Sequence, residues 1–231
     1  MTLGAAAAVL VAGLVVTTQS FAGTRTTTAA AGCTDVHIIA TRASTEAPGA
    51  GIIGSVVSAV QRASQQSVST EATAYPATLQ NYQNSVAQGV SALQKQIATQ
   101  VAACPSAKIV LMGYSQGAHV IGDVLAGSGA GLGRATQALS AGSAAKVTAV
   151  ILMGDPRYVP GKSFNAGTSK TAGRFPRPAN ASLDAFAAKA QSYCDTGDTF
   201  CASGASVQVH LSYTRKYGTV AKNFVLGRIG G

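Results

Sequence analysis

The sequence predicts one α/β domain in which helices cover both faces of a parallel sheet. Along the chain, segments with the periodicity of strands alternate with segments with the periodicity of helices. Two strand-like segments, 108–112 and 147–153, are continuous apolar runs, which is typical of strands buried on both faces. The 231 residues contain no internal repeat and no long linker, so a single three-layer domain accounts for the chain.

The first half of the chain alternates between the two periodicities. The predicted elements are, in order, a strand at 36–40, a helix at 52–60, a strand at 70–75, a helix at 82–101 and a strand at 108–112. Pro76 closes the second strand. The second helix must end before Pro105, because proline disfavours helical geometry in the residue that precedes it.

The second half continues the same alternation. Its predicted elements are a helix at 118–125, strands at 147–153 and 187–193, and a last helix at 212–226. Together these segments describe helices and strands that take turns along the chain, which is the order of a parallel sheet covered by helices.

Composition excludes several classes of protein. Charged residues make up 11% and hydrophobic residues 47% of the chain, the opposite of a disordered composition. The formal net charge is +9, but the positive residues are scattered, and the densest group is the pair Arg215-Lys216. No aromatic residues are interleaved with a basic patch, so we expect no nucleic-acid partner. A basic surface of this kind favours anionic walls or polymers.

Residues 1–31 are predicted to be a secretory signal peptide and a flexible start, with cleavage after Ala22. An uncharged apolar run covers 3–16, and Ser20-Phe21-Ala22 fits the small-x-small cleavage pattern, although no Lys or Arg precedes the run. The run is too short for a spanning helix, so no stable membrane insertion is expected. The folded domain is predicted at 32–231, and the protein is expected to be secreted.

Four cysteines, an even number, agree with export to an oxidising compartment. Three pairings are possible. Cys194 and Cys201 bracket a short turn-rich segment, and if they pair, Cys33 is left with Cys104. There is no C-x-x-C spacing and the three histidines are far apart in sequence, so no metal site is expected.

A G-x-S-x-G pattern follows the third predicted strand. The segment 113–117 lies between that strand and a helix-prone stretch, which is the context that a nucleophile elbow requires. The sharp turn needs glycines on both sides of Ser115, because a Cβ there would clash with neighbouring backbone. The turn raises the Ser115 hydroxyl above the sheet, next to the amides that open the new helix.

A serine nucleophile needs a histidine base, and in this fold the order along the chain is serine, acid, histidine. His37 precedes Ser115, and His119 lies one turn along the helix that leads away from it. His210, expected on a loop after the last strand, is therefore the predicted base.

The acid cannot be chosen from these patterns alone. Asp123 shares the nucleophile's helix, and Asp184 precedes the last strand at the wrong end of the sheet. Asp155 ends a strand on the same side as Ser115 and competes with Asp195 and Asp198. The segment between Cys194 and Cys201 is favoured, because a disulfide there would hold a carboxylate firmly. This argument applies equally to Asp195 and Asp198, so both remain candidates.

The chain resembles the cutinase family of secreted serine esterases, in the α/β-hydrolase group. The resemblance covers about residues 33–228 and rests on Thr41-Arg42-Ala43-Ser44-Thr45-Glu46, Gly113-Tyr114-Ser115-Gln116-Gly117, Asp155-Pro156-Arg157, and 194–201 with His210 shortly after. It implies a small lidless hydrolase with a five-stranded parallel sheet. It also implies that Asp198 is the acid and Asp195 a loop residue, and it pairs Cys33 with Cys104 and Cys194 with Cys201.

The resemblance further implies an oxyanion hole formed by the amides of Ser44 and Gln116, with the Ser44 hydroxyl as a third donor. A helix-capping role is the alternative for Ser44. The expected mechanism is acyl transfer from an ester to Ser115 and then to water, with no cofactor.

The predicted substrates are polyesters of the cutin or suberin type and short-chain esters, because the segment 202–209 carries small side chains and no bulky lid. An acetylxylan esterase is the alternative within the family. A non-catalytic wall-binding protein is the alternative of another class, and an intact set of Ser115, Asp198 and His210 disfavours it. The chain is expected to act as a monomer.

Overall fold

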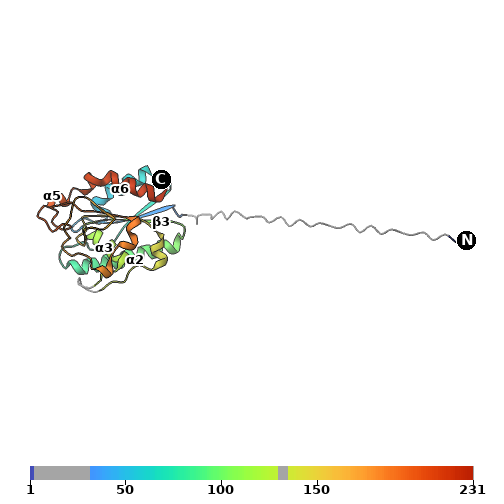
Figure 1. The fold of residues 1–231 in the computed structure, drawn as a ribbon, viewed down its shortest axis with the longest axis horizontal. Helices are drawn as coiled ribbons and strands as arrows, with labels where there is room; N and C mark the ends of the chain where they lie inside the picture. Colours follow the sequence, from blue (N-terminus) through green and yellow to red (C-terminus); the bar gives the residue numbers. More distant parts are fainter. Residues whose placement is uncertain (3–31, 130–134, 231) are drawn as a thin grey trace.

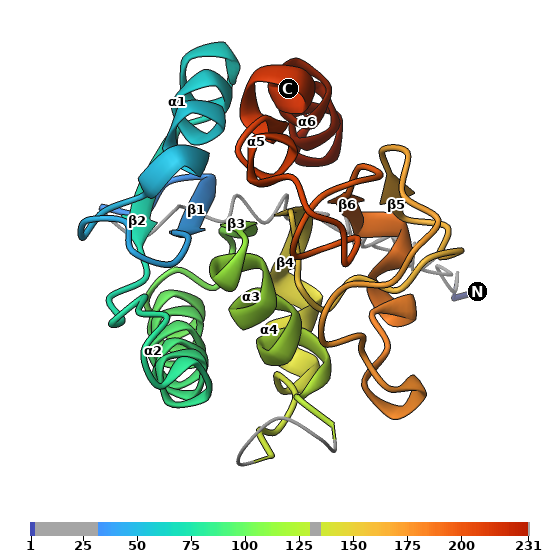
Figure 2. The ribbon, with the colours of Figure 1, turned by 90° about the vertical axis from the view of Figure 1, so that its left-hand side faces the viewer.

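A six-stranded sheet forms the centre of the computed structural model, which describes residues 1–2, 32–129 and 135–230 (Figure 2). All its neighbouring strands are parallel, in the order β2-β1-β3-β4-β6-β5. The strands are β1 (Val36–Thr41), β2 (Val68–Ala72), β3 (Lys108–Tyr114), β4 (Val147–Met153), β5 (Asn165–Ala166) and β6 (Ala190–Tyr193). The signal region predicted at 1–31 lies outside the described residues, apart from its first two.

Helices cover both faces of the sheet, as predicted (Figures 1 and 2). α1 (Gly54–Ala63) and α6 (Tyr213–Ile229) cover one face, and α2 (Tyr82–Ala103) and α3 (Gln116–Ala126) cover the other. The shorter helices are η1 (Gly51–Ile53), α4 (Ala141–Lys146), η2 (Ala179–Ala181), η3 (Asp184–Lys189) and α5 (Val207–His210). The result is the three-layer α/β arrangement.

The continuous apolar strands contribute to two cores at once. In β3, Leu111 packs in the core under α2 and α3, and Met112 packs in the core under α1 and α6. Val150 and Ile151 of β4 divide in the same way. All four side chains are fully buried. Successive side chains of a strand point to opposite faces, so a strand between two cores must be apolar at every position.

Several sequence expectations differ from the structure in detail. The strand predicted at 70–75 is β2, which covers Val68–Ala72. The sheet has six strands, not five, because Asn165–Ala166 adds a two-residue strand beside β6. The strand predicted at 187–193 begins only at Ala190, since the residues before it form the 3-10 helix η3. His210 lies at the end of the short helix α5 rather than on a loop.

Two disulfides join Cys33 to Cys104 and Cys194 to Cys201, the pairing that the family resemblance implies. The first connects the chain before β1 to the end of α2. The second closes the loop that follows β6. Within the described ranges, the helices are all too short or too polar to cross a lipid bilayer.

Candidate active site

The carboxyl ends of β1, β3, β4 and β6 lie at one edge of the parallel sheet. A cleft of about 560 Å³ opens at this edge. Ser44 after β1, Ser115 after β3 and His210 beyond β6 all line it. Ligands of open α/β sheets bind at this edge, so these predicted residues lie where the fold favours a site.

Ser115 occupies the sharp turn between β3 and α3. Its φ is 51°, a left-handed conformation that is strained for a residue with a side chain. The Ser115 amide donates a hydrogen bond of 2.8 Å to the carbonyl of Met153, which ties the turn to the end of β4. The strained turn is therefore held by the sheet on which it stands.

The two glycines of the motif allow close contact between backbone segments. A Cβ on Gly113 would lie 2.6 Å from the carbonyl oxygen of Gly117. A Cβ on Gly117 would lie 2.0 Å from the carbonyl oxygen of Thr41. Both distances are far inside van der Waals contact, so only glycine lets α3 leave the turn so close to β1 and β3. The steric requirement predicted from the motif is confirmed.

His210 contacts one carboxylate in the structure, that of Asp198. Its Nδ1 lies 2.8 Å from Oδ2 of Asp198, and Asp198 is fully buried. The ring of Phe200 packs edge-on against the imidazole, with centroids 4.5 Å apart. The Tyr114 hydroxyl donates to the carbonyl oxygen of His210. The imidazole is thus fixed by a carboxylate, an aromatic ring and its own backbone.

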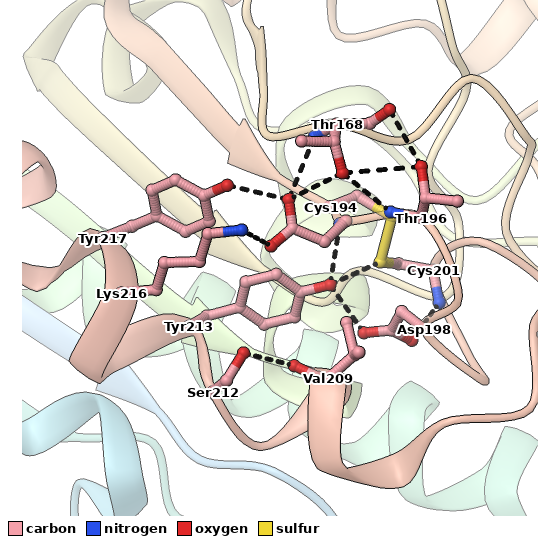
Figure 3. A network of polar contacts seen from close by, with 11 residues as sticks. Thr168, Cys194, Thr196, Asp198, Cys201, Val209, Ser212, Tyr213, Lys216 and Tyr217 are labelled. Atoms are coloured by element: carbon pink, nitrogen blue, oxygen red, sulfur yellow. Dashed lines mark hydrogen bonds and ion pairs between the residues drawn. A yellow bond between two sulfur atoms is a disulfide. The ribbon is translucent and has the colours of Figure 1, made fainter.

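Asp198 is surrounded by hydrogen-bond donors (Figure 3). Its Oδ1 accepts from the amides of Phe200 and Cys201 at 2.6 and 2.9 Å, and its Oδ2 accepts from the Tyr213 hydroxyl at 2.7 Å. Burial raises the pKa of this carboxyl, but the contacts with His210, Tyr213 and Cys201 outweigh burial and leave the pKa below its ordinary value. Asp198 is therefore an anion at neutral pH.

The other candidate acids have different partners. Oδ1 of Asp155 accepts from the amide of Arg157 at 2.8 Å, so this carboxylate stabilises the turn after β4. Asp195 binds the ammonium group of Lys216 at 2.7 Å and the hydroxyl of Tyr217 at 2.7 Å. These two carboxylates hold loops, and the geometry separates Asp195 from Asp198.

The other two histidines contact partners other than Asp198. His37 bonds Ser69 across the edge of the sheet, with Nδ1 and Oγ 2.8 Å apart. His119 is buried, with Nε2 3.2 Å from Asp123 Oδ2 and Nδ1 3.0 Å from the hydroxyl of Tyr82. Of the three, only His210 lines the cleft.

The loop that carries Ser44 is held from both sides. The Glu46 carboxylate accepts hydrogen bonds from the amides of Ala43 and Ile52 at 2.6 and 2.7 Å. The guanidinium of Arg42 donates to the Glu46 carbonyl and lies over the Tyr75 ring, 5.0 Å from its centroid. These contacts fix the backbone beside Ser44 before any ligand arrives.

Gln116 opens α3 directly after Ser115, and it does not line the cleft itself. The residue is fully buried, and its side-chain amide donates to the carbonyl of Thr78 while its side-chain oxygen accepts from Ser85. The amides that open a helix have no carbonyl within the helix to accept from them, so they are available to a ligand. The arrangement suits an anion above the turn at Ser115.

Sequence reasoning missed three residues that hold the histidine and the acid. Tyr213 bonds Asp198, and Tyr114 bonds the backbone of His210. Gly154 leaves room for the imidazole, since a Cβ there would lie 2.7 Å from Cε1 of His210. A glycine directly after a predicted strand was a usable signal. The sequence carries no such signal for Tyr213, because a tyrosine on the apolar face of a helix is equally expected as an ordinary core residue.

Among the described residues, no three His, Cys, Asp or Glu side chains are grouped so that they could share a metal ion.

Known proteins are similar to this chain over most of its length. The family model described as Cutinase matches residues 32–229. Acetylxylan esterase 2 of Talaromyces purpureogenus is 36% identical over 208 residues, which cover 86% of this chain and 88% of the relative. Cutinase 11 of Verticillium dahliae is 35% identical over 207 residues, covering 85% and 70%. The solved catalytic core of an acetyl xylan esterase from Trichoderma reesei aligns with a TM-score of 0.79 at 36% identity, covering 85% of this chain and 99% of that one.

Proposed function

Because the chain belongs to the cutinase family and is a carboxylic ester hydrolase, we propose that it cleaves esters by a serine mechanism with Ser115, His210 and Asp198. The observation that carries the proposal is the 2.8 Å contact between His210 and Asp198, beside a cleft that Ser115 also lines. A hydroxyl on a strained turn, an imidazole and a buried carboxylate are the groups that acyl transfer requires.

In the proposed reaction, Nε2 of His210 takes the proton from the Ser115 hydroxyl as its oxygen attacks the ester carbonyl. Asp198 accepts from Nδ1, so it selects the tautomer with a free Nε2 and stabilises the imidazolium that forms. The alcohol leaves with the proton from His210. Water then attacks the acyl-enzyme by the same route and releases the acid.

The carbonyl oxygen becomes negative in the tetrahedral intermediate. The Gln116 amide, at the start of α3, and the amide and hydroxyl of Ser44 are the proposed donors to it. Their support is the rigid backbone described above, since donors that are already in place need no reorganisation during the reaction. Loss of one such donor reduces turnover by about 10² to 10³-fold in other serine hydrolases.

We propose esters with apolar acyl chains, including polyesters of the cutin type, as the preferred substrates. The cleft is lined mainly by apolar and aromatic side chains, and three of them are exposed at its rim: Leu79 at 57%, Val207 at 48% and Leu211 at 51%. Exposed apolar side chains around a cleft of about 560 Å³ provide more contact surface than an acetyl group can use.

Removal of acetyl groups from xylan is the second candidate. It is supported by the 36% identity and the TM-score of 0.79 to proteins named acetylxylan esterases. The two candidates predict opposite preferences. An apolar acyl site makes kcat/KM increase with the number of methylene groups, whereas an acetyl-sized site makes it fall after two carbons.

Secretion is part of the proposal. Its support is the pair of disulfides, which form and persist in oxidising compartments, together with the apolar run at 3–16.

The test compares the wild type with Ser115→Ala and with Ser58→Ala, a control substitution on α1 away from the cleft. A fluorophosphonate probe should label the wild type and Ser58→Ala but not Ser115→Ala. Hydrolysis rates on p-nitrophenyl acetate, butyrate and octanoate, a cutin polyester and acetylated xylan then separate the two substrate classes. Labelling of Ser115→Ala at the wild-type rate would exclude Ser115 as nucleophile. An unlabelled wild type would support the non-catalytic wall-binding alternative.

A further inference from the structure

Arg174 lines the rim of the cleft that also contains Ser115 and His210. Its side chain is exposed, and it is an unusual neighbour for a cleft whose walls are mostly apolar. Its Nε donates a hydrogen bond of 2.9 Å to the carbonyl of Thr199, in the loop that carries Asp198. That contact holds the Nε end of the guanidinium, and among the described residues no hydrogen bond of its two terminal nitrogens is found.

The backbone beneath Arg174 is held on both sides. Its amide donates to the carbonyl of Phe200 at 2.9 Å, and the neighbouring amides of Gly173 and Phe175 donate to Tyr158 and Pro156 at 3.0 and 2.9 Å. A side chain with a fixed base and one fixed nitrogen loses little conformational entropy when it binds a ligand. Arg174 is therefore preorganised in a way that an ordinary surface arginine is not.

In the described part of the chain, none of the ion pairs includes Arg174. Glu46 also lines the cleft, but both of its oxygens accept backbone amides. Asp198 is fully buried and bonded to His210. Arg174 is thus the exposed charged side chain of the cleft lining, whereas Glu46 is half-buried, and the formal net charge of the protein is +9.

We propose that Arg174 binds a negatively charged oxygen group, a carboxylate or a phosphate, that the substrate carries near its ester. The enzyme then prefers acidic esters to neutral esters of the same length. A planar guanidinium presents paired N–H groups that match the two oxygens of such a group. This inference rests on the proposed esterase activity and adds the class of substrate on which the site acts best.

The apolar walls of the cleft strengthen the effect. An apolar wall lowers the local dielectric constant and excludes water, so a charge at its edge attracts an anion more strongly than the same charge on an open surface. Since Arg174 is itself exposed, the gain stays within the range of surface ion pairs, about twofold to fivefold in kcat/KM.

The experiment uses two esters of the same length: the mono-p-nitrophenyl ester of adipic acid, with a free carboxylate, and the analogue in which a neutral carboxamide replaces that carboxylate. The ratio of their kcat/KM values is measured for the wild type, Arg174→Gln and Arg174→Lys. We expect the ratio in favour of the anion to fall about twofold to fivefold in Arg174→Gln, to be partly retained in Arg174→Lys, and to decrease in the wild type as salt is added. A third ester with a terminal phosphate in place of the carboxylate shows which anion is preferred.

The matched control is Lys170→Gln, which removes one exposed positive charge at a residue that does not line the cleft. It should leave the ratio at the wild-type value. Equal ratios in the wild type and Arg174→Gln would overturn the inference, and so would an equal fall in Lys170→Gln. If the wild type hydrolyses neither ester, the proposed function fails instead, so the two failures are distinct.

Discussion

The hydroxyl of Tyr213 donates a hydrogen bond of 2.7 Å to Oδ2 of Asp198 (Figure 3). The same oxygen lies 2.8 Å from Nδ1 of His210. The hydroxyl also accepts from the amide of Asp195 at 2.9 Å. Burial raises the pKa of Tyr213 well above its ordinary value, so the phenol stays protonated and remains a donor. Through this one group, α6 positions the acid that holds the histidine.

Tyr213→Phe is therefore expected to lower kcat while KM for p-nitrophenyl butyrate changes little. A hydrogen bond to a charged group contributes about 1.5–3 kcal/mol, and loss of part of it predicts a fall of about tenfold in kcat. Steady-state kinetics at pH 8 measures the change. Tyr217→Phe is the control, because it removes the neighbouring phenol that bonds Asp195 instead of Asp198. An equal loss of kcat in both variants would contradict the positioning role.

Gly154→Ala tests how closely the backbone approaches the imidazole. The glycine has φ of +65°, and an added Cβ would lie 2.7 Å from Cε1 and 2.9 Å from Nδ1 of His210. A displacement of His210, the proposed base, by about 1 Å is expected to reduce kcat by about 100-fold.

Gly161→Ala is the matched control for this variant. Its φ is +79°, but an added Cβ would meet no atom within 4 Å, so it shares the backbone strain without the collision. Its kcat should equal that of the wild type, and both variants should lose similar stability in thermal unfolding. A wild-type kcat in Gly154→Ala would show that His210 tolerates the displacement.

The two disulfides are predicted to have different effects. Replacing Cys194 and Cys201 with alanine opens the short loop that holds Asp198, so kcat should fall together with stability, by about 2–3 kcal/mol. Replacing Cys33 and Cys104 opens a loop of 71 residues, which should cost about 4 kcal/mol and leave kcat of the folded enzyme unchanged. Urea unfolding and kinetics on the same samples measure both quantities. A larger loss of kcat in the second pair would contradict this division.

Asp123 is predicted to make stability depend on pH in acid. Burial raises its pKa, but the contacts with His119, Arg177 and Arg157 outweigh burial and lower the pKa to about 2. A carboxylate whose pKa is lower in the folded state stabilises the fold above its unfolded pKa. That contribution, about 2 kcal/mol, is lost as the pH falls from about 4 towards 2.

Asp123→Asn should remove this pH dependence and lower the free energy of unfolding at pH 7 by about 3 kcal/mol, since two buried arginines lose their counter-charge. Urea unfolding at pH 7, 5, 4, 3 and 2 measures both effects. Asp184→Asn is the control, because that aspartate pairs with Lys162 at an exposed site and should change stability little at pH 7. An unchanged slope in Asp123→Asn would assign the acid sensitivity to another carboxylate.

Local patterns predicted the local features of this protein. The continuous apolar runs identified β3 and β4 as strands buried on both faces, and helical spacing identified α1, α2 and α6 to within a few residues. The G-x-S-x-G motif placed Ser115 at the turn after β3, because the steric demand for glycine acts over five adjacent residues. The two-residue β5 was missed, since a strand that short has no periodicity to detect.

The partner of His210 depended on the packing of distant segments. From the residues alone, Asp155, Asp195 and Asp198 all followed strands on the right side of the sheet. The structure brings Asp198 to the imidazole, whereas Asp195 turns towards α6 and Asp155 closes its own turn. Only Thr196 and Gly197 separate Asp195 from Asp198 in a tight loop, and no local pattern encodes which of the two aspartates faces the imidazole.

The sequence by itself determined the layered α/β fold, the turn that carries Ser115 and the choice of His210 among three histidines. The tertiary structure decided which carboxylate meets that histidine, which phenol holds the carboxylate, and that Gly154 makes room for the ring. Periodicity and steric demands act between residues that are close in sequence, so the sequence alone predicts them. Contacts between β4, the loop after β6 and α6 depend on how these segments pack together, which only the folded molecule specifies.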